Sequence, residues 1–175
     1  MSDVKLGIGR ATGMFYHAPA GTALPTDPTA ALATAWKHVG DVSDAGITLA
    51  LEKSTENIKN WANVVKRVVL TDHSETVQAP IMDTTEEAFK VVVGEDNVVT
   101  ANDVTTVSLS DGALPPAEAF LWVMKDGDDI IMIGCTNGQV TAVDNVTFAP
   151  GSAINWNVTV TATGDDGFKL IMGTE

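Results

Sequence analysis

Alternation between apolar and polar residues recurs along most of the chain, which is the pattern of half-buried β-strands. In residues 47–53 the large aliphatic side chains are Ile47, Leu49 and Leu51. Residues 154–163 alternate in the same way between apolar side chains and Asn or Thr. Because successive side chains of a strand point to opposite faces, each of these segments predicts a strand with one buried face.

The same reasoning, together with turn signals, divides most of the remaining chain into short strands. These predicted strands are residues 13–18, 36–42, 64–70, 75–82, 98–100, 104–109, 118–125, 129–136, 140–148 and 168–172. A Ser-Asp-Ala-Gly turn predicts that residues 36–42 and 47–53 form a hairpin. Asp-Gly-Asp at 126–128 predicts a second hairpin from the strands on either side of it.

One segment, residues 84–93, has the signals of an α-helix. Asp83 or Thr84 is the candidate N-cap, Glu86 and Glu87 lie in the first turn, and Gly94 ends the helix. The apolar residues expected on its buried face are Ala88, Val91 and Val92. Many short strands with a single helix predict a mainly β domain, either a β-sandwich or a barrel-like fold.

Two segments stand outside this pattern. Residues 1–12 are glycine-rich with few large side chains, so they predict a flexible N-terminal arm ahead of a single domain at 13–175. Residues 54–63 are polar and predict a long loop between strands, and a turn is expected at 71–74.

Composition narrows the classes of function that the chain can have. The chain has 175 residues, a formal net charge of −13 and a pI near 4.4. With ten Lys and Arg against 23 Asp and Glu, it lacks the basic surface of proteins that grip nucleic-acid phosphates. No apolar run has the form of a signal peptide or the length of a membrane span, which predicts a soluble protein. The single cysteine, Cys135, lies in an apolar run and is expected to be buried.

Candidate chemistry is sparse. The glycines at 7, 9 and 13 have the spacing G-x-G-x-x-x-G, which differs from the dinucleotide fingerprint. His17, His38 and His73 are isolated from one another, and no serine lies in G-x-S-x-G. We therefore predict no catalytic residues, no metal site and no cofactor. Surface features carry the functional interpretation instead, above all the N-terminal arm and the polar loop with Trp61.

The run from Gly21 to Val69 resembles the N-terminal half of major tail proteins, the tail tube subunits of siphophages. The features that carry the resemblance, in order, are Gly-Thr-Ala-Leu-Pro-Thr-Asp at 21–27, Trp36, Gly40, Gly-Ile-Thr at 46–48, Ile58-Lys59, Trp61 and the strand from Val64. The helix signal at 84–94 also fits the family. The resemblance is best over residues 13–95 and looser beyond them.

This resemblance implies a sandwich-like β-fold with one helix and no enzymatic activity. It implies subunits that assemble with themselves into hexameric rings, which stack into a tube through which DNA passes to the host. Its further implied partners are the tape measure protein and the tail terminator and initiator proteins. The subunit would be made in the host cytoplasm and reside in the virion. No C-terminal immunoglobulin-like decoration is expected, and the acidic charge agrees with a lumen that repels DNA.

The resemblance also implies roles for three sets of residues. The N-terminal segment that would bridge subunits comprises Val4, Lys5, Leu6, Gly7, Ile8, Gly9 and Arg10. The loop that would reach a neighbouring subunit or ring comprises Glu56, Asn57, Ile58, Lys59, Asn60 and Trp61. The face that would line the lumen comprises Thr48, Ala50 and Glu52, which oppose the aliphatic face of their strand.

The alternative is a carbohydrate-binding or adhesin-like β-sandwich that uses exposed aromatic side chains. Its candidate residues are Tyr16, Trp122 and Trp156. Trp122 and Trp156 lie among apolar neighbours within predicted strands, which favours burial. A small jelly-roll enzyme is a third interpretation, and the scattered histidines give it little support.

Overall fold

The computed structural model describes residues 4–9, 14–109 and 112–175. In chain order the elements are β1 (Ile8–Gly9), β2 (Phe15–Pro19), β3 (Lys37–Gly40), β4 (Thr48–Lys59), β5 (Val65–Ile81), α1 (Glu86–Val93), the 3₁₀ turn η1 (Glu95–Asn97), β6 (Val98–Ala101), β7 (Val104–Val107), β8 (Glu118–Asp126), β9 (Asp129–Val143), β10 (Trp156–Ala162) and β11 (Lys169–Thr174). The fold is mainly β with one α-helix, as the sequence predicts.

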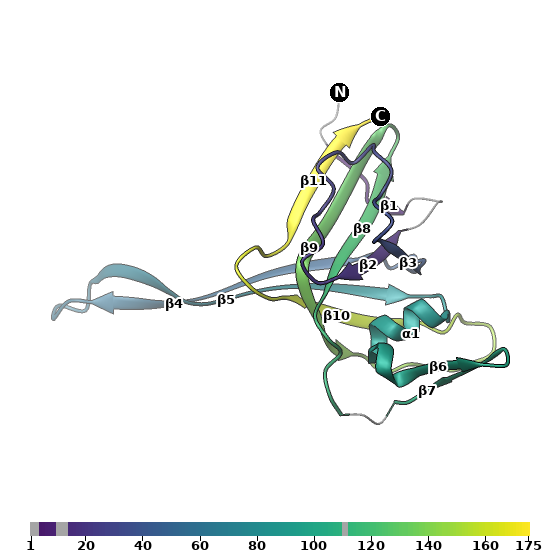
Figure 1. The fold of residues 1–175 in the computed structure, drawn as a ribbon. Coiled ribbons are helices and arrows are strands. Elements are labelled where there is room, and N and C mark those ends of the chain that lie inside the picture. The colour runs from purple at the N-terminus through teal and green to yellow at the C-terminus, as the bar shows by residue number, and fades with distance from the viewer. Residues whose placement is uncertain (1–3, 10–13, 110–111) are drawn as a thin grey trace.

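Nine of the strands form one continuous sheet, in the order β3-β2-β8-β9-β10-β5-β4. β1 pairs with β8 and β11 pairs with β9, whereas β6 and β7 form a separate hairpin. The long strand β9 joins two limbs of the sheet: β11 pairs with it along Asp129–Gly134, and β10 along Gly138–Val143. Figure 1 shows the resulting bend, with β8, β9 and β11 rising above the layer that holds β10 and β5.

The main hydrophobic core lies between the two limbs. Phe15 and Trp122 of the first limb stack with ring centroids 4.8 Å apart. They belong to the same buried cluster as Val77, Val158 and Val160 of the second limb. The sheet therefore encloses its core as an open, barrel-like curl. A single bridge between Val42 and Ile81 brings its two ends together without closing it.

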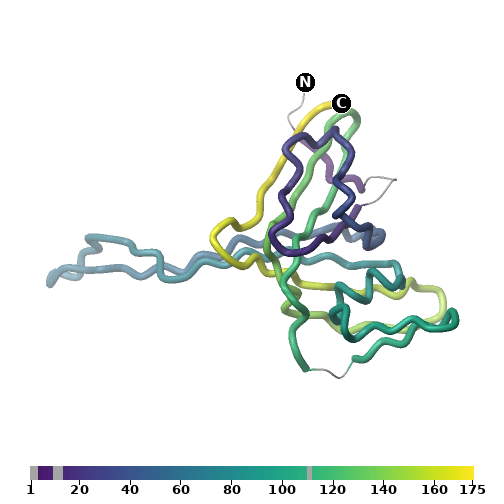
Figure 2. The backbone as a smooth tube through the Cα atoms, viewed as in Figure 1, coloured from purple at the N-terminus to yellow at the C-terminus, as the bar shows by residue number. Residues whose placement is uncertain are grey.

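A second cluster covers the opposite face of the first limb. Leu121 and Met132 point away from the main core and pack against Trp36, Leu24 and Leu32. These last three residues come from the proline-rich segment between β2 and β3, which runs across β8 and β9 in Figure 2. β8 is consequently apolar on both faces, which explains its nearly continuous hydrophobic sequence.

Helix α1 packs on the main core through Ala88, Val91 and Val92, the face predicted from the sequence. Gly94 ends the helix with a φ of 91°, also as predicted. The predicted N-cap is wrong by one residue or more, because Thr85 occupies that position. The Thr85 hydroxyl accepts a hydrogen bond from the Ala88 amide (3.2 Å).

The predicted hairpin of residues 36–42 with 47–53 is wrong. β3 pairs with β2, and β4 pairs with β5. Local alternation identified both strands correctly, but the Ser-Asp-Ala-Gly turn between them does not pair them with each other. It connects the two ends of the curled sheet, where the Ser43 amide donates to the Pro80 carbonyl (2.9 Å).

The predicted loop at 54–63 and the predicted turn at 71–74 are also wrong. β4 continues to Lys59, and β5 runs unbroken from Val65 to Ile81, so together they form one long hairpin with a short connection. The polar residues of this hairpin are paired across the ladder, for example Ser54 opposite Asp72. Backbone hydrogen bonds build such a ribbon without a buried face, and the ribbon therefore lacks the apolar alternation that identifies a strand.

The second half of the chain follows the prediction closely. β6, β7, β10 and β11 lie where alternation places them, and the β8–β9 hairpin turns at the predicted Asp-Gly-Asp. The exception is the strand expected at 140–148, whose first residues continue β9 to Val143.

Candidate assembly surfaces

The outer part of the β4–β5 hairpin, residues 52–72, projects away from the rest of the chain and is called the arm below (Figure 1). β10 pairs with β5 only along Thr76–Ile81, so the arm is a two-stranded ribbon with no third strand. Its tip is a tight connection in which the Asn60 side chain accepts a hydrogen bond from the Val64 amide (2.9 Å). Asn63 adopts a positive φ of 60° there, a conformation that Asn tolerates well.

The arm exposes large apolar side chains along its length. Trp61 at the tip is fully exposed, at 105 % of its reference area. The others are Ile58, Val64, Val65, Val68 and Leu70. Trp is common at the centres of protein interfaces and is rarely left in water, so these side chains mark the arm as an interaction surface.

The arm also holds an unusual share of the chain's positive charge. Its four cations are Lys53, Lys59, Lys66 and Arg67, and none of them forms an ion pair with a described residue. Outside the arm, by contrast, every described lysine is paired with a carboxylate. These paired lysines are Lys5, Lys37, Lys90, Lys125 and Lys169. Among the described residues, the cations without an ion pair are therefore segregated onto one projection of an otherwise acidic chain.

The six residues predicted as an inter-subunit loop all lie on the arm. Glu56, Asn57, Ile58 and Lys59 belong to β4, and Asn60 and Trp61 begin the tip. The sequence thus located the projecting segment, although it gave it the wrong secondary structure. Lys66 and Arg67 were missed as surface residues. The signal that would have found them is the gathering of basic residues at 59–67 in an acidic chain.

The predicted lumen residues Thr48, Ala50 and Glu52 share one face of the sheet. Their cross-strand partners are Gln78, Thr76 and Ser74 of β5, and Thr159 and Thr161 of β10 continue the same face. Hydroxyl and amide groups on it are linked: Gln78 donates to Thr159 (3.4 Å), and Thr141 and Thr161 are 2.8 Å apart. The residues named here are called the polar face below. Not one of them is a lysine or arginine.

The N-terminal residues 4–9 run along the β8–β9 hairpin. Ile8 and Gly9 pair with Lys125 and Met124, and the Leu6 amide donates to the Asp126 carboxylate (2.9 Å). Lys5 forms an ion pair with Asp129. This segment therefore has partners within its own chain. The role of residues 4–9 as a bridge between subunits stays a prediction, and Arg10 lies outside the described residues.

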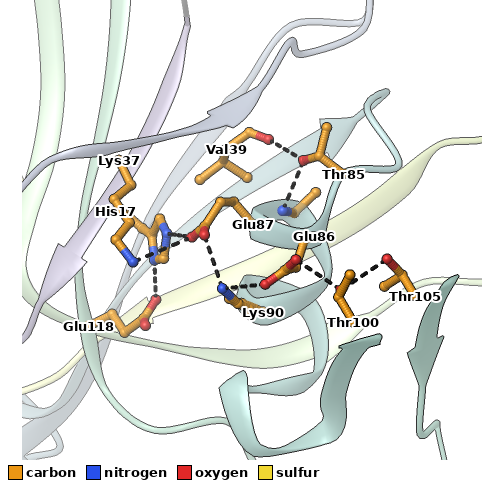
Figure 3. Close-up of polar contacts among 11 residues, drawn as sticks. His17, Lys37, Val39, Thr85, Glu86, Glu87, Lys90, Thr100, Thr105 and Glu118 are labelled. Atoms are coloured by element: carbon orange, nitrogen blue, oxygen red, sulfur yellow. Dashed lines mark hydrogen bonds and ion pairs between the residues drawn. The ribbon is translucent and has the colours of Figure 1, made fainter. Parts of the chain in front are cut away.

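A charged network ties helix α1 to the first limb (Figure 3). His17 of β2 is buried, with its ring nitrogens 2.9 Å from Glu118 of β8 and 3.1 Å from Glu87 of α1. Lys90 contacts Glu86 (2.8 Å) and Glu87 (3.0 Å) within the helix. Glu86 in turn accepts a hydrogen bond from Thr100 of β6 (2.8 Å). One signal for this network is present in the sequence: in Phe-Tyr-His, His17 falls on the same strand face as the core residue Phe15.

The network sets the protonation of His17. Burial alone would lower the pKa of His17, but hydrogen bonds and negative charge from Glu118 and Glu87 outweigh it and raise the pKa above its ordinary value of 6.5. Burial likewise works to raise the pKa of Glu87, but the contacts with Lys90 and His17 lower it overall. The group is therefore suited to hold a protonated imidazole between two carboxylates, which is a structural tie.

Other candidate chemistry finds no support in the described residues. Trp122 and Trp156, two of the aromatics needed by a carbohydrate-binding surface, are 1 % and 8 % exposed, and Tyr16 is half-buried beside His38. Cys135 is buried as predicted, and burial raises the pKa of its thiol to about 12. Within 4–9, 14–109 and 112–175, no three His, Cys, Asp or Glu side chains gather as metal ligands. In the same ranges no helix has the length and apolar character needed to cross a membrane.

Comparison with known proteins gives a family and a set of similar structures. The sequence matches the family model for phage tail tube proteins over residues 8–172. Comparison with curated proteins gives no match. Among solved structures, a chain from the tail of an empty GTA particle, obtained by helical refinement with C6 symmetry, is 9 % identical with a TM-score of 0.45. A chain from the virion of a native gene transfer agent particle is 8 % identical with a TM-score of 0.46. In both cases the match covers 91 % of this chain and 98 % of the other.

Proposed function

The chain belongs to the phage tail tube protein family, and from this premise we propose that it polymerises into stacked rings around a channel that carries DNA. Six subunits per ring is the number that the family resemblance implies. The observation that carries the proposal is the arm, which exposes apolar side chains and unpaired cations and has no packing partner in its own chain. A monomeric protein has no use for such a projection, whereas a subunit that contacts its neighbours does.

Within this assembly we place the polar face on the channel. Thr48, Ala50 and Glu52 lie on it, and it carries hydroxyls, amides and one carboxylate without a cation. A surface of this kind presents no fixed positive charge to DNA phosphates, so DNA can slide past without being held. The opposite faces of β5 and β10 are already committed to the core through Val77, Val158 and Val160.

Electron microscopy of the purified full chain in negative stain, at several protein and salt concentrations, tests the assembly. We expect rings or hollow tubes. A variant in which residues 55–71 are replaced by Asn-Gly should fold and remain dispersed, because a two-residue turn can join the opposed residues Ser54 and Asp72. Val99→Thr with Val104→Thr, which removes exposed apolar surface on the β6–β7 hairpin, is the matched control and should still form tubes.

The outcomes separate the two parts of the proposal. Tubes from the shortened variant would remove the arm from the assembly mechanism and leave the tube standing. Dispersed wild-type monomers under every condition would contradict self-assembly of the purified chain. Removal of residues 2–12 tests the N-terminal segment in the same assay, and normal tubes after that deletion would show that it does not bridge subunits.

A further inference from the structure

The positive charge of the arm is concentrated at its outer half. Between Asn57 and Thr71 the sequence contains Lys59, Lys66 and Arg67 and no acidic residue. Trp61 lies between these cations at the tip and is fully exposed. The outer arm therefore combines an aromatic anchor with three unpaired cations, and Trp and Arg are both enriched at protein interfaces.

The opposite end of β5 has the complementary charge. Asp83 lies two residues beyond the end of β5, and its carboxylate accepts a hydrogen bond from the Asp41 amide (2.8 Å). Asp44 lies in the turn that begins at Ser43, which is bonded to Pro80 of β5. Asp144 holds Asn157 of β10, which is paired with that same Pro80. Asp41, Asp44, Asp83 and Asp144 are called the acidic end below.

No cation of the described residues neutralises the acidic end. None of its four carboxylates forms an ion pair with a described residue. The three segments that build it, residues 41–48, 79–84 and 144–157, contain no lysine or arginine. The negative potential of this end is therefore available to a partner.

A groove of about 530 Å³ opens at the same end. Asp144, Ser43 and Ala45 line it beside the acidic end, and Thr48 and Gln78 line it where the polar face begins. Its size lies in the range of pockets that enclose ligand-sized groups. The groove can therefore receive a side chain as large as an indole, with the Asp144 carboxylate in its lining.

We propose that the outer arm of one copy of this chain docks at the acidic end of the next copy, with Trp61 in the groove and Lys59, Lys66 and Arg67 facing its carboxylates. The two surfaces lie at opposite ends of β5, about 50 Å apart at 3.3 Å per residue, so they cannot meet within one chain. A contact between opposite ends of identical subunits is heterologous and propagates in one direction. The contact rests on the proposed tube function and specifies how successive subunits meet along its axis.

A zero-length carbodiimide crosslink tests this contact directly, because it joins a lysine amine to a carboxylate only where the two already touch. The full-length chain is treated at high concentration, and the linked peptides are identified by mass spectrometry. We expect Lys59 or Lys66 to be joined to Asp44, Asp83 or Asp144. Arm lysines linked only to other surfaces, or not linked at all, would overturn the proposal.

Charge exchange gives the second test. Lys59→Glu, Lys66→Glu and Arg67→Glu together should abolish the crosslink and tube formation, as should Asp44→Lys with Asp144→Lys. A mixture of the two variants should restore association between unlike chains. The reversed, acidic arm of the first variant meets the basic end of the second, and the unchanged basic arm of the second meets the acidic end of the first. Lys169→Glu, at an exposed lysine outside the arm, is the control and should assemble normally.

The results distinguish this contact from the tube itself. Normal tubes from the arm-reversed chain would overturn the docking and leave the tube function intact. Crosslinked pairs without tubes from any chain would support the docking and contradict the tube function.

Discussion

Trp61 is the residue whose exposure is hardest to explain in an isolated subunit. It makes no packing contribution to the folded chain, so its side chain should matter only when a second copy is present. We expect Trp61→Ala to change the free energy of unfolding by less than about 0.5 kcal/mol, as for exposed residues generally. The same substitution should strongly reduce tube formation. Urea unfolding and electron microscopy of one preparation measure both effects.

Leu109→Ala is the matched control for Trp61, since Leu109 is also an exposed large apolar side chain outside the arm. It should leave both stability and assembly unchanged. A loss of stability in Trp61→Ala comparable to that of a core substitution would show that the indole packs on its own chain.

His17 should make stability depend on pH in a defined direction. Because its pKa in the folded chain is raised above 6.5, protonated His17 stabilises the fold fully below about pH 6.5. This contribution is lost as the pH rises through the raised pKa. We expect wild type to exceed His17→Gln in melting temperature by more at pH 6 than at pH 9. Thermal unfolding across this range measures the difference.

His38→Gln removes a histidine from the exposed part of β3 and controls for general effects of acidity on this negatively charged chain. A gap between wild type and His17→Gln that stays constant from pH 6 to pH 9 would mean that His17 is not held protonated by Glu87 and Glu118.

Helix α1 depends on its first turn. Thr85 caps the helix and its hydroxyl also donates to the Val39 carbonyl of β3 (3.2 Å), so one side chain joins the helix to the sheet. We expect Thr85→Ala to cost about 1 kcal/mol of unfolding free energy, measured by urea denaturation. Thr84→Ala, at the neighbouring exposed threonine, should cost much less. A larger loss for Thr84→Ala than for Thr85→Ala would place the cap at Thr84, where the sequence had allowed it.

The elements that the sequence predicts well are those whose signal is local. Trp156, Val158 and Val160 alternate because one face of β10 is buried, and Gly94 ends α1 because it adopts a positive φ. The β4–β5 ribbon has no buried face over most of its length. Its strands are specified by pairing with each other, and no period of apolar residues records that pairing.

Contacts between residues far apart in the sequence could not be predicted from it either. β3 pairs with β2 and not with β4, and His17 contacts Glu87, which lies 70 residues away in sequence. The same holds for the candidate assembly surface. The family resemblance located residues 56–61 on the projecting segment, but only the structure shows that every described lysine outside the arm forms an ion pair. Counting charges could not distinguish a paired cation from a free one.

At the scale of the whole molecule, charge is arranged along one axis. The described cations without an ion pair lie on the arm, the four carboxylates of the acidic end lie at the far end of β5, and the polar face lies between them. Such an arrangement gives identical subunits a common direction and leaves a cation-free surface beside the contact. Orientation within the tube and passage of DNA would then depend on the same distribution of charge.

Reversal of charge on the polar face should affect DNA without affecting assembly. We expect Glu52→Lys to form normal tubes that retain short DNA duplexes, because a ring of such subunits places repeated cations on the channel. Cosedimentation of labelled DNA with tubes at low salt measures retention. Glu95→Lys, on the 3₁₀ turn beside α1, is the control and should release DNA as wild type does. Equal retention by both variants would place Glu52 outside the channel.

The register of β5 also has a mechanical consequence. A pull on the arm along its length is carried by β5, and six consecutive residues of that strand, Thr76–Ile81, pair with β10. The hydrogen bonds of this ladder lie across the pull and are loaded together in shear, so they resist as a group instead of opening one after another. A tail that bends or is stretched would therefore transmit tension from subunit to subunit through the stiffest part of each domain.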